Sequence, residues 1–201
     1  MASKFVRAAK FTRGGMTQRE QSLGGLLGRI GQGDHDAMQE LFQQERSSLM
    51  RLFVGLCGCS SSSEDLVQGT FIALWKYRSN YRGGSASSYL YRVAVNQWRR
   101  ASARERRAKD ALKDYGPERV ARQVTEGDDP VEREETRAAV WRAIEELPEA
   151  QRETFVLHRF EGMSCPQIAE TIDKSVKTVE SRLRLALEKL TEKLQKRERL
   201  Q

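Results

Sequence analysis

The sequence has 201 residues, enough for one or two domains, and it is basic, with a formal net charge of +7 and a pI near 9.5. No apolar run approaches the length of a transmembrane helix, and no apolar stretch follows the basic N-terminus as it would in a secretory signal. We therefore expect a cytoplasmic protein without membrane insertion, and a polyanionic partner, nucleic acid before a membrane surface.

The expected fold class is all-α, because alternating β-branched runs are nearly absent whereas apolar residues recur at helical spacing. Residues 1–21 are predicted to form a flexible basic tail, followed by a short helix over residues 23–30 that ends at a pair of glycines. Asp34 then caps a long amphipathic helix that continues through Leu56.

A cluster of glycine and serine residues at 58–63 predicts a loop that ends in a helix N-cap. The third helix follows through Trp75, with Glu64 and Asp65 in its first turn, where negative charge is favourable to the helix dipole. A second loop leads into a fourth helix, expected over residues 85–109.

The segment from Tyr77 to Arg107 interleaves aromatic residues with cations. Aromatic rings stack on unpaired bases and arginines bind phosphates, so this composition is typical of a surface that binds single-stranded nucleic acid. Arg92 and Asn96 are four residues apart and share one helix face, where the amide can pair with a base edge. The alternative is that about half of the aromatic residues belong to the core and that the cations at 99–109 form a solvated helix end.

An acidic stretch with breakers at Gly116-Pro117 and at residues 127–130 predicts a linker over residues 111–130. Helical periodicity resumes beyond it. The predicted architecture is therefore two small helical domains, residues 22–110 and 131–201, joined by a flexible acidic linker.

The C-terminal domain carries a predicted helix-turn-helix. Ser164 is an N-cap residue with Gln167 three positions on, as in a capping box, and Ser175 begins a second helix. The polar face of this second helix presents hydroxyls and cations: Lys177, Thr178, Ser181, Arg182 and Arg184. In a helix-turn-helix such a helix enters the DNA major groove, whereas the alternative is an ordinary helical hairpin with a solvated face.

Cys57, Cys59 and Cys165 are too few and too irregularly spaced for a disulfide framework, and the chain has only two histidines. We expect reduced thiols, with no metal ion, no cofactor and no catalytic residue. A redox role for the Cys57 and Cys59 pair is the alternative.

Three stretches of sequence, Asp65–Trp75, Tyr89–Asn96 and Leu147–Ser164, resemble the sigma-70 family of bacterial RNA polymerase sigma factors, and within it the short extracytoplasmic-function (ECF) group. The resemblance covers roughly residues 23–194. It implies a region 2-like domain at 22–110, a region 4-like domain at 131–201, and a linker that threads into the polymerase channel towards the RNA path.

The resemblance also implies a role for each surface. The third helix would dock on the largest subunits of core RNA polymerase, through Asp65, Gln68, Ile72 and Trp75. The next segment would melt and read the −10 promoter element, through Tyr81, Arg82, Tyr89, Arg92, Asn96, Arg99 and Arg100. The second helix of the helix-turn-helix would read the −35 element in duplex DNA, through Lys177, Thr178, Ser181, Arg182 and Arg184. An anti-sigma factor is a further expected partner.

Two other functions compete with a promoter-specificity subunit. A stand-alone operator-binding regulator would use the helix-turn-helix alone, and it leaves the third helix and the aromatic and cationic segment unexplained. A thiol- or metal-dependent nuclease is the weakest reading, because no carboxylate and histidine set clusters in the sequence.

Overall fold

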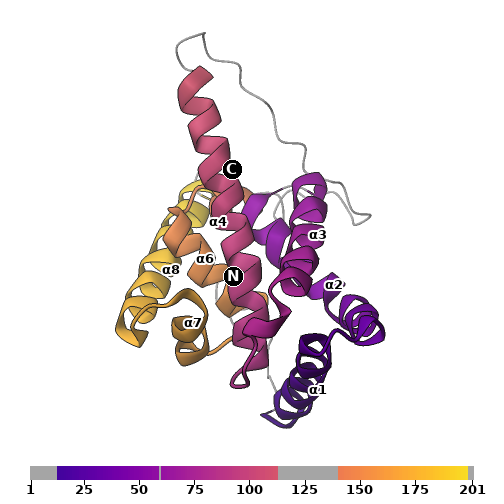
Figure 1. The fold of residues 1–201 in the computed structure, drawn as a ribbon. Helices are drawn as coiled ribbons and strands as arrows, with labels where there is room; N and C mark the ends of the chain where they lie inside the picture. The colour runs from indigo at the N-terminus through magenta and orange to yellow at the C-terminus, as the bar shows by residue number, and fades with distance from the viewer. Residues whose placement is uncertain (1–12, 59, 113–139, 199–201) are drawn as a thin grey trace, which may run out of the picture.

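A computed structural model describes residues 13–58, 60–112 and 140–198, and every regular element in these ranges is helical (Figure 1). This result confirms the all-α fold class. The elements are α1 (Arg13–Gly31), α2 (His35–Cys57), α3 (Ser60–Lys76), the short 3₁₀ helix η2 (Arg78–Asn80), α4 (Ala86–Leu112), α6 (Glu149–Arg159), α7 (Cys165–Ile172) and α8 (Val176–Glu198). Residues 140–145 are also helical.

The first helix begins earlier than its sequence predicts. The structure starts α1 at Arg13 instead of near residue 23, so residues 13–21 are helical and the predicted tail is too long. Tertiary contacts explain the difference, because Arg19 pairs with Glu45 of α2 and Glu20 accepts hydrogen bonds from Ser87 of α4. The remaining residues of the predicted tail, 1–12, lie outside the described residues.

The connection between α2 and α3 is also tighter than predicted. Gly58 ends α2 in the left-handed conformation, with φ of 74°, and its N–H donates to the carbonyl of Val54. The next helix begins at Ser60, so the serines assigned to a loop at 58–63 form its first turn instead. At the other end of α2, the predicted N-cap is confirmed, since Asp34 accepts a hydrogen bond of 3.0 Å from the Ala37 N–H.

Helices α1 to α4 form the N-terminal bundle around buried leucines and aromatic rings. The side chains that fill it include Leu23, Ile30, Leu41, Leu49, Leu52, Phe53, Leu74 and Leu90. The 27-residue α4 lies between α1–α3 and the C-terminal helices (Figure 1). Its predicted end near residue 109 falls three residues short of the observed one at Leu112.

The C-terminal helices build the predicted helix-turn-helix from α7 and α8. Ser164 and Gln167 form a capping box at the start of α7, and Ser175 accepts a hydrogen bond of 3.1 Å from the Thr178 N–H at the start of α8. Asp173 closes α7 in the left-handed conformation, with φ of 55°, which a short polar side chain tolerates. The tight turn between the two helices is therefore confirmed.

The two halves of the chain pack against each other and share one buried core. Helix α2 contacts α6, and α4 contacts α7. We call the surfaces of α2 and α4 that face α6, α7 and residues 160–164 the domain interface. Residues 113–139, which include most of the predicted linker, lie outside the described residues.

Candidate nucleic-acid interface

Helix α3 presents an exposed polar and apolar strip to solvent. Asp65, Gln68 and Ile72 are exposed, and the Ile72 side chain is 67% accessible. Ile72 is the most exposed large apolar side chain among the described residues.

Trp75 continues this strip but also has contacts within the domain. Its ring centroid lies 4.2 Å from that of His35, and the Arg78 guanidinium lies 4.9 Å from the Trp75 ring centroid. Trp75 is therefore half-buried, and a structural role accompanies any role in docking.

Two tyrosines meet where η2 and its loop lead into α4. The rings of Tyr81 and Tyr89 lie 5.2 Å apart between centroids. The Tyr89 hydroxyl donates to the carbonyl of Tyr77 at 3.4 Å, and the Tyr81 hydroxyl donates to the carbonyl of Gly84 at 3.3 Å. Partial burial raises the pKa of both phenols, so both remain neutral donors at physiological pH. Both rings are therefore held in place but partly accessible.

One side of α4 is an exposed row of cations and one amide, which we call the α4 outer face: Arg92, Asn96 and Arg100. The Arg92 guanidinium lies 5.9 Å from the Tyr89 ring centroid, so the row starts beside the aromatic pair. Arg82 is exposed in the preceding loop. Of the seven residues predicted for the −10 element, Arg92, Asn96 and Arg100 thus share one exposed side of α4. Tyr89 lies beside Arg92 and packs against Tyr81.

Arg99 differs from the other predicted −10 residues. It points to the domain interface, where its Nε and Nη2 donate to the two carboxylate oxygens of Glu153 at 3.2 and 2.7 Å. The Glu153 side chain is only 4% exposed. Burial raises the pKa of Glu153, and the charges of Arg99 and Arg182 act in the opposite direction.

Two aromatic residues of the segment are core residues. Tyr91 and Trp98 are 1% and 3% exposed and pack inside the shared core. This bears out the alternative that part of the aromatic and cationic segment is structural.

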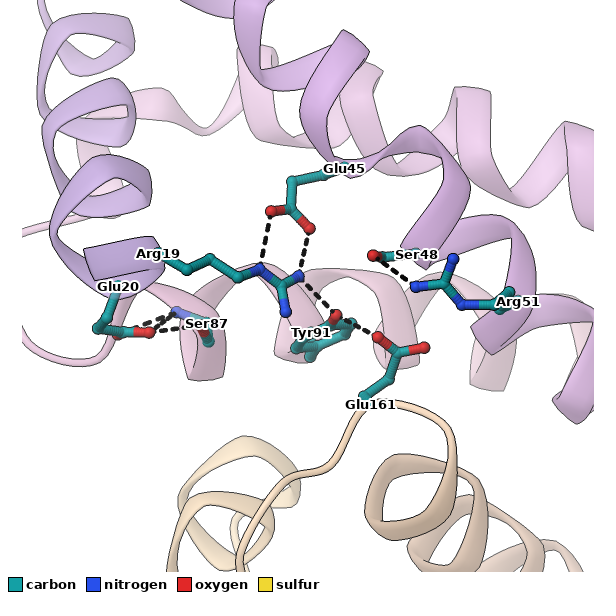
Figure 2. Close-up of polar contacts among 8 residues, drawn as sticks. All are labelled: Arg19, Glu20, Glu45, Ser48, Arg51, Ser87, Tyr91 and Glu161. Atoms are coloured by element: carbon teal, nitrogen blue, oxygen red, sulfur yellow. Dashed lines mark hydrogen bonds and ion pairs between the residues drawn. The ribbon is translucent and has the colours of Figure 1, made fainter. Parts of the chain in front are cut away.

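A polar network that the sequence did not predict surrounds Tyr91. Figure 2 shows Arg19 of α1 lying between Glu45 of α2 and Tyr91 of α4, and the Tyr91 hydroxyl donating to Glu161. Arg19 contacts Glu45 at 2.6 Å and the Tyr91 oxygen at 3.1 Å. Burial raises the pKa of Tyr91, and the Glu161 carboxylate raises it further. The signal in the sequence was a tyrosine in register with the core residues Ala94, Val95 and Trp98.

The predicted −35 residues lie on α8 in three different environments. Lys177 and Ser181 are exposed. The Thr178 hydroxyl lies 2.8 Å from that of Ser175, within the helix cap. Arg184 donates to Glu188 one turn later, at 2.7 Å. Arg182 is half-buried, and its positive charge is close enough to Glu153 to lower the pKa of that carboxyl group.

Beside this surface runs a shallow groove along α8, lined by Glu180, Leu183 and Leu187 and by Cys165 at the start of α7. Cys165 is partly buried and Cys57 is buried, and neither forms a disulfide with another described residue. Across the described ranges, His, Cys, Asp and Glu side chains nowhere gather in a group of three suited to a metal ion. Within those same ranges, no helix has both the length and the apolar character needed to cross a membrane.

A capped helix-turn-helix with an exposed cationic second helix, together with a row of cations beside aromatic rings on α4, is typical of a helical DNA-binding protein. Comparison with known proteins extends this assignment. The sequence matches the family model "Sigma-70 region 2" over residues 41–108 and the model "Sigma-70, region 4" over residues 137–190.

Two curated relatives match nearly the whole chain. The ECF RNA polymerase sigma-E factor of Escherichia coli (strain K12) is 31% identical over 182 residues, which are 85% of this chain and 93% of the relative. The RNA polymerase sigma-H factor of Pseudomonas aeruginosa is 29% identical over 178 residues, 85% of this chain and 92% of the relative. The chain belongs to the ECF group of the sigma-70 family.

Two solved structures share the fold. CnrH, in complex with the cytosolic domain of CnrY, superimposes with a TM-score of 0.64 at 23% identity, over 87% of this chain and 97% of that one. The sigma factor RpoE of Bartonella quintana, in complex with the anti-sigma factor NepR, gives a TM-score of 0.63 at 22% identity, over 81% and 98%.

Proposed function

We propose that this chain binds core RNA polymerase and directs promoter-specific initiation of transcription. The observation that carries the proposal is the match to both sigma region 2 and sigma region 4, in that order, on a chain that covers most of its curated relatives. Sigma factors are initiation factors, so the chain acts by binding, and the chemistry of RNA synthesis belongs to the polymerase. A region 2-like domain that includes the whole of α1, a region 4-like domain over residues 131–201 and a cytoplasmic location are part of the same proposal.

Docking on the largest polymerase subunits is assigned to α3. Asp65 supplies charge, Gln68 a hydrogen-bonding amide and Ile72 a large exposed apolar side chain on one helix face. Trp75, held against His35 and Arg78, continues this face at the end of the helix. A strip of this kind, apolar at its centre and polar at its edge, matches the usual composition of a protein interface.

Capture of the melted −10 strand is assigned to Tyr81, Tyr89 and the α4 outer face. The two rings offer stacking surfaces for flipped bases, each worth about 1–3 kcal/mol, and Asn96 offers an amide for a base edge. Arg92 and Arg100, with Arg82 in the loop, neutralise the backbone phosphates. Arg99 joins this set once it is released from Glu153.

Reading of the −35 duplex is assigned to the start of α8. Residues near the N-terminus of the second helix of a helix-turn-helix reach base edges, which here are Lys177, Ser181 and Arg182. Thr178 supports the cap and Arg184 contacts the phosphate backbone after exchanging its partner Glu188.

An anti-sigma factor is the proposed regulatory partner. In the two similar structures, CnrH is bound to the cytosolic domain of CnrY, and RpoE of Bartonella quintana is bound to the anti-sigma factor NepR. We extend this kind of partner, without its identity, to the present chain.

Size-exclusion chromatography with purified core polymerase tests the proposal. The chain should co-elute with core polymerase in a one-to-one ratio. A stand-alone operator-binding regulator, the competing function, would bind DNA by itself and would not co-elute with core polymerase.

A further inference from the structure

One side of α1 runs along the segment that leads into α4. Glu20, Gly24 and Gly31 are separated by four and seven residues, which are about one and two helical turns, so they share this side. We call residues 78–87, which comprise η2, the loop after it and the first residues of α4, the capture segment. Helix α1 contacts both η2 and α4, so it follows the capture segment from one end to the other.

Glu20 caps the start of α4. Ser87 lies in the first turn of α4, where backbone N–H groups have no partner within the helix. Its N–H donates to both carboxylate oxygens of Glu20, at 3.1 and 3.3 Å, and its hydroxyl donates to the same carboxylate (Figure 2). Negative charge at this end of a helix also interacts favourably with the helix dipole. Helix α1 therefore supplies a cap for α4.

This cap is additional to the one that α4 provides for itself. The Ser85 side chain accepts a hydrogen bond of 3.1 Å from the Ser88 N–H, which is the usual arrangement of an N-cap serine. Glu20, in contrast, is 67 positions away from Ser87 and belongs to another helix. The contribution of Glu20 is therefore to hold the start of α4 against α1, since Ser85 already supports the helix itself.

Gly24, one turn after Glu20, lies against a ring that the proposed function assigns to the melted strand. A Cβ placed at Gly24 would lie 3.3 Å from the hydroxyl oxygen of Tyr81 and 3.8 Å from Cβ of Ala86. The first separation is shorter than an ordinary van der Waals contact, so a methyl group there would displace the Tyr81 hydroxyl by a few tenths of an ångström. Glycine inside a helix is less favourable than alanine, and this close approach accounts for its presence.

The other glycines of α1 show that the close approach is local. A Cβ at Gly25 or at Gly28 would meet no atom within 4 Å. A Cβ at Gly31 would lie 3.5 Å from the carbonyl oxygen of Arg78 in η2, which is an ordinary contact. Of these four glycines, only Gly24 lies so close to a side chain that an added methyl group would displace it.

The contacts of Tyr81 extend this restraint to the second ring. The Tyr81 hydroxyl, which faces Gly24, donates to the carbonyl of Gly84 at 3.3 Å, and the Tyr81 ring lies 5.2 Å from that of Tyr89 between centroids. Burial raises the pKa of the Tyr81 phenol, and the charge of Glu20 raises it further. Helix α1 thus acts on Tyr81 by contact at Gly24 and by charge from Glu20.

We propose that this side of α1 is the rear wall of the −10 base pocket, where Glu20 and Gly24 are positioning residues that fix Tyr81 and so determine which base is captured. They act through Ser87 and Tyr81, without contacting the base. The shape of a pocket decides which flipped base it accepts, so a displaced ring changes the preferred base. The inference rests on the proposed function for the identity of the captured strand, and the contacts of α1 with Tyr81 and Ser87 do not depend on it.

Gly24→Ala tests the proposal, and Gly25→Ala is the matched control. Both replace a glycine of α1 by a better helix former, so circular dichroism should show that both chains keep their helices. Core polymerase with each variant transcribes a library of promoters randomised across the −10 and −35 elements. Gly24→Ala should weaken the preferred base at one −10 position by about fivefold and leave the −35 preference within about twofold, whereas Gly25→Ala should match wild type. Equal −10 preferences in the two variants overturn the proposal.

Tyr81→Phe provides a rescue that isolates the contact with Gly24. It removes the hydroxyl oxygen that the added methyl group would displace and keeps the ring for stacking. In the Tyr81→Phe background, Gly24→Ala should therefore leave the −10 preference within about twofold. A loss that persists in full in this background would mean that Gly24 does not act through the position of Tyr81.

Glu20→Ala and Glu20→Gln test the cap. Glutamine keeps a side-chain oxygen that can accept from the Ser87 N–H, so Glu20→Gln should retain the −10 preference within about twofold. Glu20→Ala should weaken it at the same position as Gly24→Ala. Glu40→Ala, which removes a carboxylate of a pair between α1 and α2, is the control and should not. An unaltered −10 preference in Glu20→Ala overturns the role of Glu20.

Fluorine NMR of the free chain, labelled with fluorotyrosine, separates this inference from the proposed function. Tyr81→Phe identifies the Tyr81 resonance by its loss. Gly24→Ala should shift this resonance, and Gly25→Ala should not. If the resonance shifts as expected but the wild-type chain does not initiate with core polymerase, the proposed function fails and the positioning of Tyr81 by α1 stands. A Tyr81 resonance that is unchanged in Gly24→Ala contradicts the positioning, whatever the result of transcription.

Discussion

The Tyr91 hydroxyl donates a hydrogen bond to the carboxylate of Glu161, which joins the N-terminal part of α4 to the turn that precedes the helix-turn-helix. The two residues are 70 positions apart in sequence and both are buried. Arg19 and Glu45 extend the contact through α1 and α2, so a single chain of polar contacts crosses the N-terminal bundle and reaches the C-terminal half (Figure 2).

This contact predicts a pH-dependent stability. Burial raises the pKa of Glu161 above its ordinary value, so the native state binds the proton more tightly than the unfolded chain. The stability linked to that proton is present below the unfolded pKa and is lost as pH rises through the native pKa. Glu161→Gln, which carries no charge, should therefore have a higher free energy of unfolding than wild type at pH 7, and this difference should close towards pH 4.

Urea unfolding across that pH range measures this difference. Glu146→Gln, at an exposed position, serves as the control and should show no such convergence. If the difference in free energy of unfolding between Glu161→Gln and wild type stays constant with pH, ionisation of Glu161 does not limit stability.

Two glycines should respond to alanine in opposite directions. Gly58 has φ of 74°, and an added Cβ would lie 1.5 Å from Oε1 of Glu145, so Gly58→Ala should destabilise the fold by more than about 1 kcal/mol. Gly69 lies inside α3 with its nearest neighbour, Oε1 of Gln97, at 3.8 Å, so Gly69→Ala should stabilise it by about 0.5–1 kcal/mol. Thermal and urea denaturation measure the change in the free energy of unfolding for each variant. If both substitutions stabilise the fold, or both destabilise it, this interpretation of the two glycines is wrong.

Charge reversal on α3 should weaken polymerase binding. Asp65→Arg is expected to lower the affinity for core polymerase about tenfold, which is about 1.4 kcal/mol, without loss of helix. Glu64→Arg, at the adjacent exposed position, is the matched control for net charge. If both variants lower the affinity for core polymerase equally, the effect comes from net charge and Asp65 has no specific role in docking.

Asn96 should contribute more to melting of the −10 DNA than to formation of the closed promoter complex. Asn96→Ala is expected to reduce permanganate reactivity of the −10 region at least tenfold while leaving closed-complex affinity within about twofold, because the amide meets only an unpaired base. Asn80→Ala, exposed on η2, is the control. Normal melting in Asn96→Ala would move the strand-capture site away from the α4 outer face.

The cations of α8 should divide into base and phosphate contacts. Lys177→Ala or Arg182→Ala should relax the preferred −35 sequence, with about 1–3 kcal/mol lost at one base pair. Arg184→Ala should weaken binding uniformly and reduce the salt slope by about one. Holoenzyme binding across −35 variants distinguishes these outcomes, and a uniform loss in all three variants would assign sequence choice to another element.

Local sequence rules predicted the caps well. Asp34, Ser164 and Gln167 form the hydrogen bonds expected from their spacing, and Asp173 adopts the left-handed turn. These features depend on neighbours three or four residues away, so the sequence alone contains the information. The α4 outer face was predictable for the same reason, since helical spacing defines it.

The domain interface was not predictable by these means. Glutamate side chains are usually exposed, and Glu153 and Glu161 are buried beside their partners Arg99 and Tyr91, which lie 54 and 70 positions away in the sequence. The early start of α1 has the same origin, because Arg19 and Glu20 bind residues of other helices. Helical periodicity identifies a face and leaves the partner of that face undefined.

The most direct test of the account is transcription in vitro from a library of randomised promoters with purified core polymerase and this chain. The account predicts that adding the chain selects a discrete set of start sites, each preceded by a common −10 and −35 sequence, and that core polymerase alone selects none. If transcripts with and without the chain start at the same sites, the chain does not direct promoter-specific initiation.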